Sequence, residues 1–395
     1  MKVIIFSTYY KRGGAELQAI FERNILNRKN IQTLYVTFDP DLDNGYSCEE
    51  GHINLEGKYK TIKRRLLNLF VDPILYLKVT KLLKSEKPDL VHFHNITYGF
   101  ITLAMAAKKF KTIQTMHDYA YVCDKSMKCI TNEYRVCESC SYSNCKRQCF
   151  DSGIKGRLLL LYKWNVRKLN RYIRNRNIDF IISPSKKLSD YLNDNGYKSV
   201  VVNNPLDLDE FTHQKCLTQK KKVLMYGSLR EDKGIYQLLD AFRVTDYHNI
   251  ELELIGPKGK DLDDRRFEYL LKKSGANYLG VYNHKEITRK LAEVYAVIIP
   301  SLWMENYPNT ALEGMLTDCI VCGSDRGGIP EMVVSRNLLF DVLDPEDIKR
   351  CLRYLDCMSE YERIQLCNIQ KEKILENNTP EAYLGKLADI TGIDL

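Results

Sequence analysis

The stretch that decides the fold of this chain lies in its second half and runs Ile298-Ile299-Pro300-Ser301-Leu302-Trp303-Met304-Glu305-Asn306-Tyr307-Pro308-Asn309-Thr310-Ala311-Leu312-Glu313. An apolar run, a polar loop and a helix-forming segment predict a strand, a loop and a helix in that order. Thr310 and Glu313 have the spacing of a capping box, so the helix is predicted to begin at Thr310. The backbone N–H groups and dipole of such a helix favour anion binding at the loop.

Two carboxylates frame this segment, Glu305 in the loop and Glu313 in the first helical turn. Carboxylates accept pairs of hydroxyl hydrogen bonds, such as those of a sugar. From spacing alone two interpretations stay open. Either both side chains face one cleft and bind a ligand, or Glu313 caps the helix while Glu305 is a solvated loop acid.

Working outward, short apolar runs alternate with amphipathic stretches along both halves of the chain, which predicts βα units and parallel sheets. The predicted strands of the first half are Val3–Phe6, Thr33–Val36, Leu90–Phe93, Thr112–Thr115, Phe180–Ile182 and Val200–Val202. Those of the second half are Val223–Tyr226, Glu251–Ile255, Tyr278–Leu279, Val297–Ile299 and Ile320–Cys322. We therefore expect an α/β protein with two facing Rossmann-like, doubly wound parallel-sheet domains and a ligand cleft between them.

The domain boundary is predicted within Asn203–Asp207, giving an N-terminal domain over 1–206 and a C-terminal domain over 207–375. A tail from about 376 to 395 is expected to pack back on the first domain. Residues 1–206 hold 34 Lys and Arg against 19 Asp and Glu, whereas the remainder holds 25 against 32. A basic half joined to an acidic half suggests domains with different partners, and both anionic lipid and nucleic acid suit the basic one.

The length of 395 residues suits two domains that each bury a core. No run approaches the ~18 apolar residues of a membrane span. The apolar start over Met1–Phe6 is too short for a signal peptide and is interpreted as the first buried strand of a cytoplasmic protein. In that compartment the 13 cysteines are not expected to form a disulfide framework.

Several further segments follow one another in an order and spacing that, together with the Glu305–Glu313 motif, characterise a known family: Arg12-Gly13-Gly14-Ala15-Glu16, Lys87–Asn95, Thr115-Met116-His117-Asp118-Tyr119, Ser183-Pro184-Ser185, Asn203–Asp207, Gly227–Gly234 and Gly327-Gly328-Ile329-Pro330-Glu331. Over nearly its whole length the chain resembles the retaining GT-B glycosyltransferases of family 4, the glycosyl transferases group 1. The resemblance implies transfer of a sugar from a nucleotide-diphosphate sugar to a hydroxyl of a glycan or lipid-linked saccharide, in cell-surface polysaccharide assembly. It implies no cofactor.

The resemblance also implies roles for matching residues of the second half. Glu305 would hold hydroxyls of the transferred sugar, and Glu313 those of the nucleotide ribose. Backbone N–H groups of Tyr307, Asn309 and Thr310 would bind the phosphates.

The loop Gly227–Gly234 is a second expected anion site, because glycines after a strand let a phosphate approach the backbone. Lys233 matches the family's lysine and would stabilise the leaving diphosphate. Ser228 stands where the family usually has an arginine, and Arg230 is a candidate substitute. Without the resemblance, an exposed charged turn is the favoured interpretation of this loop.

In the first half, Gly13 and Gly14 would form the turn that opens the first helix, against the phosphates and the acceptor. A dinucleotide fold ranks below this, since no G-x-G-x-x-G follows the first strand. His117 would lie beside the transferred sugar, and a structural role is expected for His92. The expected catalytic residues are Glu305, His117 and Lys233. The D-x-D patterns at Asp41–Asp43 and Asp207–Asp209 suit turns, and no catalytic metal is expected.

Six cysteines cluster between Cys123 and Cys149. A structural zinc site of Cys129, Cys137, Cys140 and Cys145 is one hypothesis. Thiols without metal, or a redox-labile disulfide, are the alternatives, because paired C-x-x-C knuckles are absent. Asp318 also departs from the family, which usually has glycine at that position.

Two basic stretches suit an anionic membrane surface. The first is Lys58–Arg65, followed by apolar residues, and the second is Lys155–Arg176, with eight Lys and Arg, no acid, and apolar and aromatic residues. A basic helix with an apolar face is typical of peripheral membrane proteins, which predicts a position at the inner face of the membrane. A solvated helix face that covers the core is the plain alternative.

Two other functions stay open at this point. A sugar-nucleotide epimerase or another GT-B enzyme would use the same nucleotide-sugar site. A zinc-stabilised nucleic-acid-binding protein would use the cysteine cluster and the basic half, but it leaves Glu305 and Glu313 without a role, so no nucleic-acid partner is expected.

Overall fold

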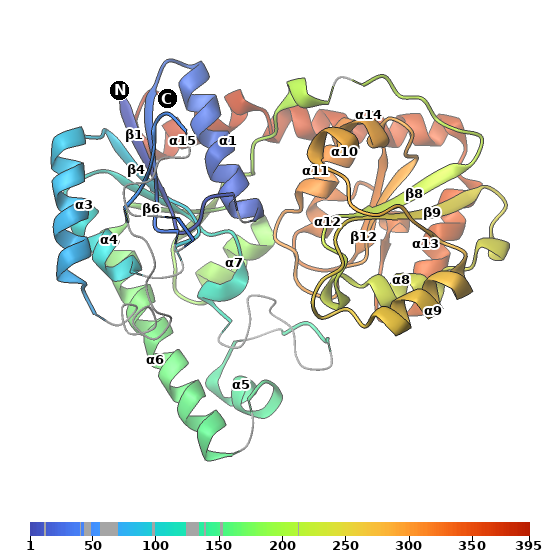
Figure 1. The fold of residues 1–395 in the computed structure, drawn as a ribbon, viewed down its shortest axis with the longest axis horizontal. Coiled ribbons are helices and arrows are strands. Elements are labelled where there is room, and N and C mark those ends of the chain that lie inside the picture. The colour runs from blue at the N-terminus through green and yellow to red at the C-terminus, as the bar shows by residue number, and fades with distance from the viewer. Residues whose placement is uncertain are drawn as a thin grey trace. The chain divides into compact units, whose positions relative to one another are not determined.

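The computed structural model describes residues 1–11, 13–39, 41–42, 49–55, 70–96, 99–123, 134–137, 140–150, 153–211 and 213–395. The chain divides into two compact α/β units (Figure 1). Unit 1 comprises Met1–Asn132, Cys137–Pro205 and Pro380–Leu395, and unit 2 comprises Glu133–Val136 and Leu206–Thr379. The C-terminal segment therefore belongs to the same unit as the N-terminal half.

A sheet of seven parallel strands, in the order β3-β2-β1-β4-β5-β6-β7, forms the centre of unit 1. Its strands are β1 (Lys2–Ser7), β2 (Gln32–Thr37), β3 (His52–Asn54), β4 (Leu90–Phe93), β5 (Thr112–Thr115), β6 (Phe180–Ser183) and β7 (Ser199–Val201). The run Val3–Phe6 in β1 is fully buried. Such continuous apolar runs are expected where helices cover both faces of a parallel sheet.

The helices of unit 1 are α1 (Gly14–Arg28), α3 (Pro73–Glu86), α4 (Phe100–Ala107), α5 (Tyr142–Gln148), α6 (Ile154–Asn177), α7 (Lys186–Asp194) and α15 (Pro380–Thr391). Most of them pack on this sheet, whereas α5 and the N-terminal half of α6 lie away from it (Figure 1). The start of α3 shows why these boundaries form where they do. The carboxylate of Asp72 accepts from the backbone N–H groups of Ile74 and Leu75, and Pro73 occupies the first helical position, where a missing N–H has no cost.

Unit 2 holds a sheet of six parallel strands in the order β10-β9-β8-β11-β12-β13. The strands are β8 (Lys221–Tyr226), β9 (Ile250–Ile255), β10 (Asn277–Tyr278), β11 (Ala296–Ile299), β12 (Ile320–Ser324) and β13 (Leu339–Phe340). The helices are α8 (Ile235–Ala241), α9 (Asp264–Ser274), α10 (His284–Leu291), α11 (Asn309–Leu316), α12 (Ile329–Met332), α13 (Pro345–Cys357) and α14 (Glu360–Asn377). The two doubly wound parallel sheets confirm the predicted fold class.

Two strands have no counterpart in the sequence prediction, β3 and β13. Both are edge strands of two or three residues. An apolar run that short carries no periodicity, so only pairing with β2 or β12 identifies it. Within the described residues, no helix is both long enough and apolar enough to cross a bilayer.

The core of unit 1 extends to the C-terminal helix α15. Tyr383, Leu384 and Leu387 are buried in one apolar cluster with residues of β1, such as Val3 and Ile5. The chain leaves unit 1 after Pro205 and returns to it at Pro380. The stability of unit 1 therefore depends on residues at both ends of the sequence.

We predict that Leu387→Ala lowers the unfolding free energy of unit 1 by about 2–5 kcal/mol, because it opens a cavity in a fully buried cluster. Denaturant unfolding with hydrogen exchange at β1 and β8 would locate the loss in unit 1. Leu375→Ala on α14 removes a leucine that is 50% exposed and serves as the control. Equal losses in the two variants, or a loss confined to β8, would contradict this role of α15.

Candidate functional site

Glu305 is a buried carboxylate at the centre of the loop between β11 and α11. It is 7% exposed. Its Oε1 accepts hydrogen bonds from Lys233 Nζ at 2.5 Å and from Ser301 Oγ at 2.6 Å. Lys233 Nζ also lies 4.1 Å from the ring centroid of Trp303, a cation–π distance. The loop therefore presents an ion pair between Lys233 and Glu305, whose carboxylate is largely shielded from water.

Glycines bring the three segments of this site into contact. Gly234 has φ +76°, and a Cβ there would lie 1.7 Å from the carbonyl oxygen of Pro300. Gly327 has φ +61°, and a Cβ there would lie 1.9 Å from the carbonyl oxygen of Glu305. The N–H of Gly328 donates to that same oxygen at 2.7 Å. Only glycine fits such approaches, so these residues position Glu305 from both sides.

The loop Gly227–Gly234 is tied to the Glu305 loop through the backbone. The carbonyl of Asp232 accepts from the N–H groups of Leu302 and Trp303, at 3.0 and 3.3 Å. Ser228, at the position of the family's arginine, is exposed. Arg230 donates to the carboxylate of Asp232 and lies 3.8 Å from Asp261. Its guanidinium is therefore held by Asp232 of its own loop and lies close to Asp261, between β9 and α9.

Glu313 lies in α11 and bonds to Tyr226 at the end of β8. The Tyr226 hydroxyl donates to Glu313 Oε2 at 2.7 Å and lies 3.2 Å from the carbonyl oxygen of Thr310. Burial raises the pKa of Glu313, and the hydrogen bond from Tyr226 opposes that rise. The carboxylate is thus poised to gain from any ligand that donates hydroxyl hydrogen bonds to it.

The predicted capping box at Thr310 is wrong. The helix begins at Asn309, its N-cap is Pro308, and no side chain makes a cap hydrogen bond there. The Glu313 carboxylate, which the capping box would have used, instead accepts a hydrogen bond from Tyr226, a residue distant in sequence. The N-cap residue Pro308 therefore makes no side-chain cap hydrogen bond to the first turn of α11.

The other predicted residue of this segment, Tyr307, is buried, and its hydroxyl lies 3.3 Å from Asn378 Oδ1 at the end of α14. Its side chain therefore serves the packing of unit 2. Any contact of Tyr307 with a phosphate would have to be made by its backbone.

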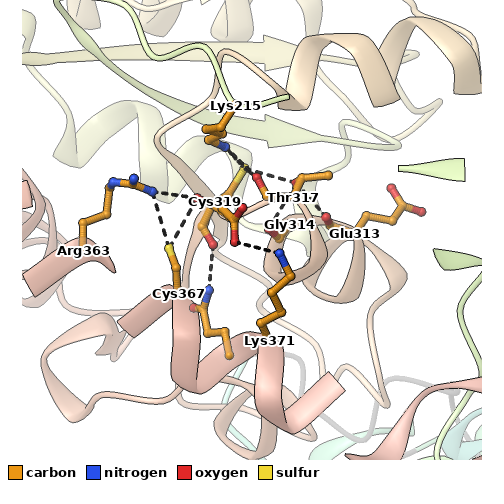
Figure 2. Close-up of polar contacts among 10 residues, drawn as sticks. Lys215, Glu313, Gly314, Thr317, Cys319, Arg363, Cys367 and Lys371 are labelled. Carbon is orange, nitrogen blue, oxygen red and sulfur yellow. Dashed lines mark hydrogen bonds and ion pairs between the residues drawn. The ribbon is translucent and has the colours of Figure 1, made fainter. Parts of the chain in front are cut away.

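The C-terminal end of α11 is anchored by charged side chains from several elements (Figure 2). Lys215 Nζ donates to the carbonyl oxygens of Thr317 and Leu291, at 2.8 and 3.0 Å. Arg363 on α14 donates to the carbonyl oxygen of Asp318 at 3.0 Å, and Lys371 lies 3.6 Å from the Asp318 carboxylate. These contacts fix the helix that carries Glu313.

Asp318 has φ +54°, in the left-handed region that favours glycine. Glycine, which the resemblance led us to expect at this position, would adopt this conformation without strain. Aspartate is one of the few other residues that tolerate this conformation, and the bonds from Arg363 and Lys371 offset its strain.

In unit 1, Gly13 is the N-cap of α1 and Gly14 its first residue, whereas Arg12 lies outside the described residues. Glu16, in the first turn of α1, accepts from the Asn95 side chain at 2.6 Å. The position of Gly13 matches the predicted turn at the start of the first helix.

His117 follows β5, and its Nε2 lies 2.9 Å from Nδ1 of His94. Burial lowers the pKa of His117 well below its ordinary value, so the ring is neutral near pH 7. His92 is fully buried, with Nδ1 2.8 Å from Glu22 Oε1 and Nε2 2.7 Å from Thr115 Oγ1.

Glu22, His92 and His94 each offer one atom of a type that binds metal ions, and these atoms lie within 4.8 Å of one another. They form the one such group among the residues that the structure describes. Glu22 is hydrogen-bonded to both histidines, and each histidine has a second hydrogen-bond partner, Thr115 for His92 and His117 for His94. We therefore interpret the group as a hydrogen-bond network.

The zinc hypothesis gains no support. Cys129 lies outside the described residues. Sγ of Cys140 and Sγ of Cys145 are 3.8 Å apart, but the described cysteines do not form a group of three metal-binding atoms. Asp43 and the basic stretch Lys58–Arg65 also lie outside the described residues.

Three residues of the unit 2 site were missed as site residues: Ser301, Trp303 and Tyr226. Ser301 and Trp303 lie inside the quoted motif, so their proximity to Glu305 was the available signal. Tyr226 ends a predicted strand, and nothing local marks it as the partner of Glu313, 87 residues away.

Family models match both halves of the chain. Residues 209–364 match the family described as glycosyl transferases group 1, and residues 12–210 match the one described as Glycosyltransferase Family 4. The chain therefore belongs to the glycosyltransferase family that these two models describe, and it is a glycosyltransferase of the GT-B class. This excludes the nucleic-acid-binding hypothesis as the main function.

Two curated proteins of Klebsiella pneumoniae, both described as uncharacterized proteins in the cps region, are similar to this chain. The 41.2 kDa protein is 24% identical over 303 residues, which is 71% of this chain and 72% of that protein. The 42.6 kDa protein is 21% identical over 377 residues, which is 88% of this chain and 91% of that protein.

Among solved structures, sucrose-phosphate synthase from Thermosynechococcus elongatus matches with a TM-score of 0.69 at 16% identity, covering 98% of both chains. Anabaena HepE in complex with UDP and glucose matches with a TM-score of 0.67 at 16% identity, covering 100% of both. At these identities the similarity is one of fold.

We predict that Glu313→Gln makes the protein more stable at pH 7, contrary to the loss that a capping role would cause. The folded pKa of Glu313 is raised, so the native state binds its proton more tightly than the unfolded state does. Stability from this group is present below the unfolded pKa and falls as pH rises towards the folded value. Denaturant unfolding from about pH 4 upwards should show a growing advantage of the variant.

Glu293→Gln is the control of opposite sign. The hydrogen bond from Lys222 lowers the pKa of Glu293, so its stabilisation is present above the unfolded pKa and lost as pH falls. That variant should be less stable than the parent at pH 7. If the unfolding free energy of Glu313→Gln follows that of the parent at every pH, the Glu313 carboxylate is better solvated than we infer.

Proposed function

We propose that this chain is a retaining glycosyltransferase that moves a sugar from a nucleotide-diphosphate sugar to a hydroxyl of a glycan or lipid-linked saccharide. The observation that carries the proposal is the buried Glu305 carboxylate, held by Lys233 and Ser301 beside the start of α11. It joins an acceptor for sugar hydroxyls to a cation and to the start of a helix. A nucleotide-diphosphate sugar requires that combination of groups.

The arrangement divides the ligand into three parts. Lys233 and Ser301 both bond to Oε1 of Glu305, which leaves Oε2 to accept hydroxyls of the sugar. Glu313 would accept the ribose hydroxyls. The diphosphate would meet the N–H groups of Asn309 and Thr310 and the loop Gly227–Gly234.

Trp303 adds a hydrogen-bond donor to this region. Its Nε1 is buried and has no partner within the part of the chain that the structure describes. A buried N–H of this kind is costly unless something accepts from it. An oxygen of the bound nucleotide sugar is a suitable acceptor.

In the proposed reaction the bond between the anomeric carbon and the phosphate oxygen breaks, and its electrons stay on the diphosphate. The acceptor oxygen forms its bond to the same face of the sugar, and its proton passes to the leaving phosphate. Lys233 and the start of α11 stabilise the charge that develops on that phosphate. Arg230 could assist only after its guanidinium released the carboxylate of Asp232 and bound a phosphate instead. We assign to His117, Gly13 and Gly14 the contacts with the transferred sugar and the acceptor.

The names of similar proteins support the substrate class. HepE has been solved with UDP-glucose, another structural neighbour is described as a lipopolysaccharide outer core galactosyltransferase, and the curated relatives come from a cps region. We therefore place the reaction in cell-surface polysaccharide assembly. A thermal-shift screen of UDP-, GDP- and ADP-sugars would identify the nucleotide sugar, since a ligand at 100 times its Kd stabilises by about 2.7 kcal/mol.

We also propose that the enzyme is cytoplasmic and docks on the inner face of an anionic membrane through α6. The N-terminal half of α6 extends away from the sheet of unit 1 (Figure 1). Ile154, Leu158, Leu161 and Tyr162 are exposed there at helical spacing, with relative exposures from 43% to 77%. Lys155 and Arg157 are exposed beside them. An apolar stripe flanked by cations fits a bilayer with anionic headgroups.

Glu305→Gln is predicted to lower kcat at least about 100-fold, because it removes the charge that orients the sugar and balances Lys233. Transfer would be measured with radiolabelled nucleotide sugar and product analysis, which also detects an epimerised donor. Glu268→Gln breaks an exposed Lys–Glu pair in the same unit and should leave transfer unchanged. Near-normal turnover of Glu305→Gln with a folded protein would reject the proposed function.

The double substitution Leu158→Gln and Leu161→Gln is predicted to weaken binding to vesicles that contain anionic phospholipid by about 10-fold or more, since two apolar side chains leave the bilayer. Cosedimentation at increasing salt would measure it, with zwitterionic vesicles for comparison. Leu375→Gln on α14 is the matched exposed control. Equal binding by both variants would show that α6 is a solvated helix.

A further inference from the structure

The hydroxyl of Tyr226 connects the end of a strand of unit 2 with the first turn of a helix. Tyr226 is the last residue of β8, and β8 pairs with β11, the strand that leads into α11. Because the sheet is parallel, the end of β8 and the start of α11 lie near the same edge of it. The hydroxyl donates to Glu313 Oε2 at 2.7 Å and lies 3.2 Å from the carbonyl oxygen of Thr310. Both oxygens belong to α11, so this one hydroxyl ties β8 to the helix start.

Within the part of the chain that the structure describes, Tyr226 is the one hydrogen-bond partner of the Glu313 carboxylate. His284 and Glu210 act on this carboxylate through space, but their side chains bond to each other at 2.9 Å. In Figure 2 the Glu313 side chain points away from Lys215 and the other charged groups that anchor the end of α11. Tyr226 therefore holds Oε2 of Glu313, whereas Oε1 can accept from a ligand.

The bond from Tyr226 matters because a glutamate side chain is flexible when nothing holds it. Restricting its rotatable bonds at the moment of binding costs free energy, which weakens the affinity for the ligand. A tyrosine is a suitable support, since its ring has few rotatable bonds and carries the hydroxyl at a fixed place. The Tyr226 side chain is half-buried at the end of β8, which restricts it further. The Glu313 carboxylate is thus oriented before a ligand arrives.

We propose that Tyr226 is a positioning residue for ribose recognition, which holds the Glu313 carboxylate so that Oε1 accepts a hydrogen bond from a ribose hydroxyl of the bound nucleotide. The assignment of the ribose to Glu313 rests on the proposed function. Tyr226 contributes orientation and need not touch the nucleotide. Its hydroxyl therefore affects the affinity only for ligands that carry ribose hydroxyls.

The test compares a nucleoside diphosphate with its 2′,3′-dideoxy analogue. Isothermal titration of the full-length protein with UDP, GDP and ADP identifies the nucleotide that the parent binds. Tyr226→Phe keeps the ring and loses only the hydroxyl, so it should raise the Kd of that nucleotide about 3- to 10-fold. The Kd of the dideoxy analogue should change by less than about 1.5-fold, because that ligand has no hydroxyl to donate to Glu313. The preference for ribose should fall accordingly.

Tyr354→Phe is the matched control. The Tyr354 hydroxyl donates to Glu362 Oε1 at 2.5 Å, so this variant also removes one hydrogen bond between a tyrosine and a glutamate of unit 2. That bond connects α13 with α14 and lies outside the proposed nucleotide site. The Kd values of both ligands should stay within about 1.5-fold of those of the parent.

Two further measurements show whether Tyr226 acts through Glu313. In Glu313→Ala the carboxylate is absent, so the additional change Tyr226→Phe should raise the Kd of the nucleotide by less than about 1.5-fold. In steady-state kinetics, Tyr226→Phe should raise KM for the nucleotide sugar about 3- to 10-fold and leave kcat within about 2-fold. This division is expected because the ribose is remote from the anomeric carbon at which the bond breaks.

The binding measurements need no turnover, so they separate a failure of this proposal from a failure of the proposed function. A parent that binds none of the three nucleoside diphosphates would reject the proposed function, and this proposal with it. A parent that binds one of them without preferring ribose, or a Tyr226→Phe variant that keeps the parent's preference, would overturn the positioning role alone. Equal losses of affinity for both ligands in Tyr226→Phe would likewise overturn it, since the hydroxyl would then only stabilise the helix start.

Discussion

The unit 2 site depends on a charged pair, the buried carboxylate of Glu305 with the partly exposed ammonium of Lys233. Removing two charges from water is costly, and their attraction repays that cost only with close geometry and further hydrogen bonds. Ser301 and the ring of Trp303 supply the additional contacts. The geometry in turn requires Gly234 and Gly327, where a side chain would collide with the backbone of Pro300 and of Glu305, respectively. The geometry of the Glu305–Lys233 pair and the presence of the two glycines therefore form a single constraint on the sequence.

The elements around this pair are held so that little rearrangement is needed when a ligand binds. Lys215 and Arg363 bond to the carbonyl oxygens at the end of α11, and Tyr226 bonds to Glu313 near its start. These hydrogen bonds hold the helix at both ends. A helix start that is held in place is suited to an anionic group, because its backbone needs little further ordering.

Much of the fold followed from the order of apolar runs, because buried parallel strands leave a strong signal. Nearly all strands lie where the runs predicted them, and the exceptions, β3 and β13, are too short to show a pattern. The site was predictable in part. Lys233 and Glu305 were expected from the family motif, whereas the capping box failed because Tyr226 takes Glu313 from a distant strand. The bond between Arg230 and Asp232 likewise has no sequence signature beyond proximity.

The sequence by itself determined the parallel α/β class, the family, and the residues whose roles depend on local spacing, such as Glu305 eight positions before Glu313. The tertiary structure alone decided which polar groups become partners. Glu22, His94, His117 and Tyr383 come from four segments and meet only because β1, β4 and β5 are neighbours and α15 returns to unit 1. The reason is physical. Periodicity records which face of an element is buried, but a hydrogen bond between distant segments depends on distances and proton positions that only the assembled fold sets.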